Sequence, residues 1–261
     1  YDYERARAVS ARDPQIRLPR TADLVPPSLG RITTEAATAG EVTRLPARRV
    51  AGVAAPGLRL DPASAATSID HVDLWVEEET GLALAIEVFA TGSDVAVVTS
   101  RFEEFSSERP APELVAPTWS DQVEQERTDT VDLADAANRY APFRVPQVVA
   151  GLERRTTGGD AGGAATGGTG AVGVYGTGVT RLIAVPLRGQ DAEPLREALL
   201  ASPTAETTED GGTLVAVGPL SIFLTSLDGI IYVVAGTVTA ETVTRAGADV
   251  LAGVRLRRGV R

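Results

Sequence analysis

Two runs of alternating apolar residues, joined by a short turn that contains glycine, constrain the fold of this chain more than any other feature. A period of two is typical of a β-strand with one buried face, and a glycine-containing turn between two such runs predicts an antiparallel hairpin. A second turn at 91–94 leads into a third run over 95–105. Residues 71–105 are therefore predicted to form a three-stranded antiparallel meander. The alternating positions are Val72, Leu74 and Val76, then Leu82, Leu84, Ile86 and Val88.

Strand alternation assigns the residues of this meander to two faces. Leu74, Leu84 and Ile86 are predicted to share one apolar face. The other face carries small residues beside aromatic ones, which is typical of a covered surface or of a concavity that receives an acyl chain. Two interpretations stay open: a ligand-binding concavity, or an ordinary core beneath a segment that precedes this sequence. The candidate lipid-binding residues on this second face are Trp75, Ala83, Ala85 and Phe89.

Three absences in the composition exclude several classes of functional site. There is no cysteine, which excludes disulfides, thiolate nucleophiles and cysteine-held metal clusters. All 25 basic residues are arginine, which excludes a P-loop lysine and Schiff-base chemistry. His71 is the only histidine, which excludes a metal site built from several histidines. We predict no metal site and no cofactor.

The charge balance bears on the partners of the protein. A formal net charge of −10 predicts no binding to nucleic acid, because a phosphate backbone rewards clustered positive charge. No apolar run approaches the roughly 20 residues of a membrane span. The sequence contains no methionine, so we expect a segment upstream of residue 1, such as a signal or a membrane anchor.

The pattern along the chain predicts two domains. Residues 1–120 indicate a β domain, 121–141 a linker, and 142–254 a smaller α+β domain that carries a glycine-rich loop at 156–178. The second domain is predicted to be a sandwich in which two helices cover one sheet. Its strands are expected over 179–187, 212–217, 220–227 and 230–238, and its helices over 192–201 and 240–252, the latter capped by Thr239.

Shorter patterns predict four further elements. Ser28 is expected to cap a helix over 29–39. Pro46 and Pro56 are expected to limit 42–60 to one or two short edge-like strands. A single strand is predicted over 144–152, and a short helix over 130–140.

The glycine-rich stretch allows two interpretations. Glycines let a backbone approach a pyrophosphate at a helix N-terminus, so the stretch could bind phosphate. The residues that follow it cannot begin a helix, and no lysine is present to hold the phosphates. A flexible insertion loop between two strands is therefore favoured.

The carboxylates near the only histidine are the remaining candidates for catalysis. His71 lies beside Asp70 and Asp73, an arrangement that could form part of a general base. The sequence has no GxSxG nucleophile motif and no second histidine, so an ordinary surface histidine on a strand is favoured. An enzyme that uses Asp70, Asp73 and Glu87 would lack companion residues at a useful spacing. We predict no catalytic residue, and expect that the chain is not an enzyme.

The segments 72–76 (VDLWV) and 78–88 (EETGLALAIEV) carry a resemblance to a known family. They are similar to the strand ending in V-x-L-W-V and the T-G-L hairpin of the lipoprotein-carrier superfamily, which includes LolA and the N-terminal domain of MucB/RseB-like regulators. The resemblance covers about 46–105, with Ala83 where proline is usual. Residues 142–254 resemble, more weakly, the C-terminal domain of the MucB/RseB-like proteins.

The resemblance implies both a fold and a function. The family fold is a curved antiparallel sheet, an incomplete barrel whose apolar face is covered by helices and receives acyl chains. The family sheet has further residues upstream, so this chain is expected to hold the later half of that domain. The two-domain order implies an extracytoplasmic, lipid- or lipoprotein-sensing regulator that acts on a membrane-anchored anti-sigma factor. A lipid or lipoprotein carrier of the envelope is the alternative.

Overall fold

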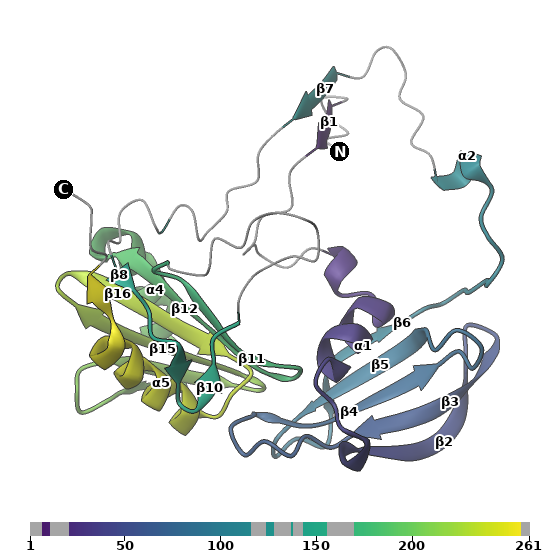
Figure 1. Cartoon of the computed structure of the whole chain (residues 1–261), viewed down its shortest axis with the longest axis horizontal. Helices are drawn as coiled ribbons and strands as arrows, with labels where there is room; N and C mark the ends of the chain where they lie inside the picture. The colour runs from purple at the N-terminus through teal and green to yellow at the C-terminus, as the bar shows by residue number, and fades with distance from the viewer. Residues whose placement is uncertain are drawn as a thin grey trace.

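The computed structural model describes residues 7–10, 21–115, 124–127, 137, 143–155 and 170–256. These residues form two large open antiparallel sheets that lie side by side, each with its own buried core, and three short two-stranded pairs (Figure 1). The fold class is α+β, as predicted. Below, the first unit denotes residues 21–115, with the first sheet, and the second unit denotes residues 143–155 and 170–256, with the second sheet.

The first sheet has five strands that pair antiparallel in chain order. Its last three strands are the predicted meander, which is confirmed. Its first two strands are longer than predicted, because a register break between Leu45 and Arg48 accommodates Pro46 within the strand. The five strands are β2 (Val42–Val50), β3 (Val53–Leu60), β4 (Ile69–Val76), β5 (Ala83–Ala90) and β6 (Ala96–Arg101).

Helix α1 (Pro26–Thr34) lies across one face of the first sheet, against β5 (Figure 1). It begins before the predicted start because two prolines fill its first turn, where a missing N–H is harmless. Ser28 Oγ donates to Ala22 O instead of capping the helix. The helix ends at Thr34 rather than at 39. Two 3-10 helices flank it, η1 (Thr21–Asp23) and η2 (Ala39–Glu41).

The second sheet has six strands in the order β11-β12-β16-β15-β14-β13. As predicted, two helices cover it, α4 (Gly189–Leu200) on one face and α5 (Ala240–Gly253) on the other. Both faces of β15 are apolar, because Phe223 packs toward α5 and Leu224 toward α4. The strands are β11 (Gly173–Thr177), β12 (Thr180–Arg188), β13 (Ala205–Thr207), β14 (Thr213–Val217), β15 (Leu220–Leu227) and β16 (Ile230–Gly236).

The single strand predicted over 144–152 is wrong. The segment instead forms β8 (Phe143–Arg144) and β9 (Val148–Val149), and β10 (Leu152–Glu153) follows. Ala150 and Gly151 adopt positive φ between β9 and β10, so the chain turns there instead of extending. β8 pairs with the last strand, β17 (Arg255–Leu256), which brings the two ends of the second unit together.

Several predicted segments fall wholly or largely outside the described residues. The predicted linker 121–141 is described only at β7 (Glu124–Arg127) and residue 137, and so the helix predicted over 130–140 is not tested. β7 pairs in parallel with β1 (Arg7–Ser10), and α2 (Pro112–Val115) follows the first sheet. Residues 156–169 of the glycine-rich stretch also lie outside. The boundaries at 120 and 142 stay predictions.

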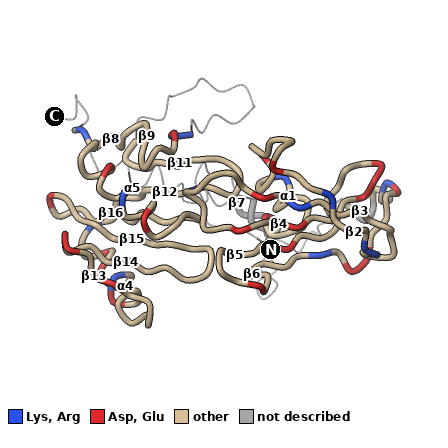
Figure 2. Tube along the Cα trace, turned by 90° about the horizontal axis from the view of Figure 1, so that it is seen from below, with Lys and Arg blue, Asp and Glu red and all other residues tan. Residues whose placement is uncertain are grey.

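Charged residues of both signs are interspersed along both units in the described part of the chain (Figure 2). Among the described residues, no helix is long and apolar enough to cross a membrane.

Candidate functional site

A cavity of about 700 Å³ lies between α1 and the first sheet. Its sheet side is apolar, and α1 covers it from above with Gly30 at the closest approach, where an added Cβ would lie 3.0 Å from Ala83 Cβ. A nine-residue helix is too short to cover five strands, so part of the apolar face remains unfilled. The apolar lining comes mainly from Leu58, Leu60, Leu74, Val76, Leu82 and Ala83.

The polar groups of this cavity lie at its helix side and at the β4–β5 turn. Arg31 and Thr34 of α1 line one part, and Thr80 lines another. Arg31 is exposed and, among the described residues, is the one charged residue that lines the cavity. The arrangement can hold an apolar chain over the sheet and offer a guanidinium to an acceptor group at the rim.

The structure keeps three of the four residues that the sequence placed on one face, because Ala85 pairs with Trp75 and Phe89 pairs with His71 in the same register, and it moves Ala83 to the other face. A bulge where β5 meets the end of β4 shifts the register between Trp75 and Val76, and it inverts the alternation at Leu84. Ala83 therefore packs with Leu74 beneath α1 and lines the cavity. Leu84 packs with Trp75 on the opposite face. The prediction that Leu84 shares the face of Leu74 is wrong, and so is the grouping of Ala83 with Trp75.

Trp75 packs beneath an element of its own sheet. It is fully buried, its indole Nε1 donates to Pro46 O at 3.2 Å, and the guanidinium of Arg48 lies 3.7 Å from the ring centroid. Gly57 pairs with Trp75 and leaves room for the indole, because a Cβ at Gly57 would lie 2.9 Å from Nε1. β2 bends at its register break, and its residues Pro46 and Arg48 cover the sheet face at Trp75. Of the two sequence interpretations, a covered core describes Trp75, although β2 and not an upstream segment covers it.

The rest of that face carries ion pairs. Arg59 binds both carboxylate oxygens of Asp73, at 2.7 and 2.8 Å. The hydrogen bonds that Arg59 donates to Asp73 raise the pKa of Arg59 above its ordinary value. Arg48 pairs with Glu87 at 2.8 Å. Two of the three carboxylates considered for catalysis are thus held by arginines.

The histidine side chain is also engaged by its neighbours. His71 Nδ1 lies 2.7 Å from Asp70 Oδ2, and the imidazole stacks on Phe89 with the ring centroids 4.2 Å apart. Phe89 therefore contacts a histidine rather than the cavity. Within the described residues, no three potential ligand side chains come together as a metal site.

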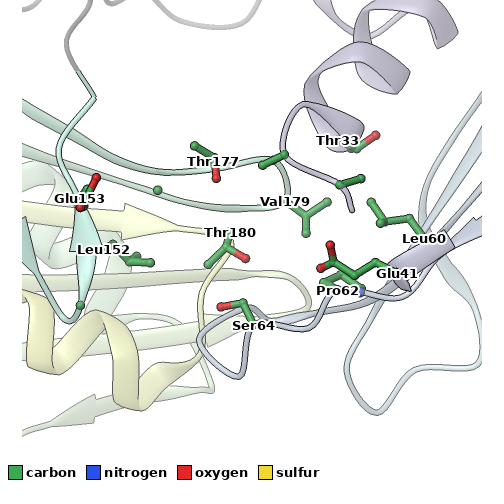
Figure 3. Close-up of a pocket in the computed structure, with 15 residues that line it drawn as sticks. Thr33, Glu41, Leu60, Pro62, Ser64, Leu152, Glu153, Thr177, Val179 and Thr180 are labelled. Carbon is green, nitrogen blue, oxygen red and sulfur yellow. The ribbon is translucent and has the colours of Figure 1, made fainter. Parts of the chain in front are cut away.

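A second cavity of about 320 Å³ lies between the two units (Figure 3). Val179, at the turn of the β11–β12 hairpin, reaches across and packs in the same buried cluster as Leu60 and Leu74 of the first sheet. Figure 3 shows Val179 opposite Leu60 and Glu41, with Thr33 of α1 above. Ala37 and Leu60 line both cavities, so the hairpin turn lies at one end of the space under α1.

Ion pairs and backbone bonds hold the two units together. Glu35, just after α1, accepts from Arg155 at 2.6 and 2.7 Å and also from Arg181. The hydrogen bond from Arg155 and the two positive charges hold the pKa of Glu35 at about 2, against an ordinary value of 4.5. Thr67 also forms a β-bridge with Val238. Sequence reasoning missed this junction, because nothing in the sequence relates Glu35 to arginines 120 and 146 positions away.

Comparisons with known proteins give a likeness of fold at low identity. Similar solved structures include the Pseudomonas aeruginosa MucA/MucB complex (16% identity, TM-score 0.49) and MucB in complex with MucA(peri) (17%, 0.45). A third similar structure is that of MucB, with 16% identity and a TM-score of 0.42. The matches cover 84%, 84% and 82% of this chain, and 65%, 68% and 62% of those chains. No protein-family model matches the chain, and no curated protein does.

Proposed function

We propose that this chain is an extracytoplasmic, non-enzymatic sensor of the MucB/RseB-like kind. In this proposal, the first unit binds the acyl chain of a lipid or lipoprotein in the cavity under α1, and the second unit contacts a membrane-anchored anti-sigma factor. The single observation that carries the ligand half is the cavity of about 700 Å³ with an apolar sheet side and one charged lining residue, Arg31.

The size and chemistry of the cavity suit an acyl chain. Ligand pockets in proteins typically enclose about 300–1,000 Å³, and this one falls in that range. Each methylene that leaves water contributes roughly 0.8 kcal/mol, so a chain of moderate length gains enough to bind without polar recognition along its length. The guanidinium of Arg31 then suits an anionic or ester headgroup at the rim.

The partner half of the proposal rests on the sequence resemblance of residues 142–254. MucB, one of the similar proteins above, has been solved in complex with MucA. A carrier of lipid or lipoprotein is the second candidate, because the ligand cavity is formed almost entirely by the first unit and would serve a carrier equally well. The two differ in whether a stable complex with a membrane-anchored partner forms.

A titration with a fluorescent fatty acid, such as dansyl-undecanoic acid, tests the ligand half. Leu58→Trp places an indole in the cavity and is expected to weaken binding at least tenfold. Thr43→Trp is the matched control, because Thr43 is exposed on the neighbouring strand and pairs with Arg59 on the opposite face. Absent binding to the wild-type chain, or equal binding by Leu58→Trp, would contradict the proposal.

A further inference from the structure

The two sheets present four edge strands, and three of them carry features that prevent pairing with another chain. β2 holds a proline, a register break and the exposed arginines 44, 48 and 49. β13 has only three residues. β11 is covered by the segment after β10, where Arg155 N donates to Val174 O and Arg154 bridges to Tyr175. The fourth edge, β6, has six residues and no proline, its register break lies at its start between Ala96 and Val98, and among the described residues no strand covers it.

The outer side of β6 has free backbone hydrogen-bonding groups. Phe102 N donates to Leu84 O, on the side that faces β5. Alternation along an antiparallel strand therefore directs the N–H and C=O groups of Thr99 and Arg101 outward. Among the described residues, no backbone group pairs with this outer side.

Exposed apolar side chains surround this edge. Val95, in the turn before β6, is 73% exposed, and Val97 and Val98 are exposed as well. The β14–β15 turn of the second unit adds Val217, which is 57% exposed, and Leu220. The two units meet here, because a Cβ at Gly218 would lie 3.9 Å from Val97 Cγ1. The edge patch, defined as these five valine and leucine residues, therefore spans both units.

We propose that β6 and the edge patch bind an extended segment of a partner protein, which adds as a sixth strand to the first sheet. Free backbone groups on a strand edge select an extended peptide, and the exposed valines select β-branched or apolar side chains on it. A net charge of −10 favours a segment that is neutral or basic.

A second copy of this chain fits the edge less well. A stable dimer buries about 1,600 Å² in total, whereas a six-residue strand with a few valines offers a small part of that area. Two copies of the chain would also repel each other through their like charge. A peptide strand needs no such area, because its backbone hydrogen bonds supply much of the affinity. The surface lies outside the cavity under α1, so the inference is independent of acyl-chain binding.

The test uses the full chain and a synthetic peptide of alternating threonine and valine flanked by arginines. Amide hydrogen exchange is measured with and without the peptide. We expect slower exchange at Thr99 and Arg101, and no change with the same peptide N-methylated at alternate positions, which lacks the donors. Thr99→Pro removes the outward N–H at a position where an edge strand tolerates proline, and Thr99→Ala is the matched control that keeps it.

We expect the dissociation constant to rise at least tenfold in Thr99→Pro and less than twofold in Thr99→Ala. Equal binding of both peptides by the wild-type chain would overturn the proposal without any variant. So would the absence of slowed exchange at millimolar peptide. A concentration-dependent dimer that Thr99→Pro abolishes would also overturn it, because it would assign the edge to a second copy of the chain.

Discussion

The two sheets of this molecule are covered in different ways, and the difference separates a unit with a cavity from a filled one. The first sheet is covered on one face by a single nine-residue helix and keeps about 700 Å³ beneath it. The second sheet has a helix of 12 residues on one face and one of 14 on the other. Under α5, the Phe223 ring lies so close to Gly247 that a Cβ there would be 2.4 Å from it. In this molecule the short helix leaves a cavity beneath it, whereas the longer α5 covers a filled core.

The largest effect that would sharpen this comparison is expected from Phe223→Ala. Removing a buried ring from a filled core loses transfer free energy and leaves a cavity, which typically costs about 3–5 kcal/mol of the free energy of unfolding. Phe102→Ala removes the same side chain from the first unit, where the ring is half-buried, and is expected to cost less than half as much. Urea unfolding measures both, and equal losses would argue against the difference between the units.

Gly247→Ala is the converse test in the second unit. Alanine is the better helix former by roughly 1 kcal/mol, so propensity alone predicts stabilisation. The new Cβ would overlap Phe223, and overpacking of this kind typically costs about 1–3 kcal/mol. We expect a net loss of stability by thermal unfolding. Gly189→Ala in α4 is the control, because its Cβ would meet only Gly229 O at 3.6 Å and should leave the Tm unchanged or raised.

Glu35→Gln tests the junction between the two units. Because Glu35 is partly exposed, solvent screening reduces the contribution of its ion pairs to stability. We therefore expect Glu35→Gln to lower the free energy of unfolding by about 1 kcal/mol at pH 7. Its pKa in the folded protein is about 2, below the ordinary 4.5, so its contribution is full above pH 4.5 and is lost as the pH falls toward 2. The stabilities of wild type and Glu35→Gln should therefore converge in acid, and a constant difference from pH 7 to pH 2 would refute the assignment.

The smallest effect is expected where the first unit is hollow. Leu58→Phe enlarges a side chain that lines the cavity, so the ring can enter empty space instead of displacing neighbours. We expect a change of less than about 0.5 kcal/mol in the free energy of unfolding, in contrast to Gly247→Ala. A loss of several kcal/mol would show that the space under α1 is not available to a ligand.

Sequence patterns predicted most strands of the two sheets, because burial on one or both faces leaves a regular signal. They did not predict β13, and β11 lies within the predicted glycine-rich loop 156–178. They failed where one residue breaks that signal. The bulge at Leu84 carries no mark in the sequence, and it moves Ala83 from one face to the other. The cavity itself could not be predicted, since alternation shows that Leu74 is covered but not how completely. Contacts between distant residues, such as Glu35 with Arg181, were equally beyond reach.

The insertion of Val179 makes the two units unequal in their dependence on each other. Val179 belongs to the second unit by sequence and to a core of the first unit by contact. Among the described residues, the main core of the second unit contains only residues from 145 onward. A fragment that ends before Val179 would thus lose part of its interior, whereas the isolated second unit would keep its own complete. The asymmetry lies in packing: among the described residues, the first unit completes a buried cluster with a side chain of the second, whereas the main core of the second unit takes none from the first.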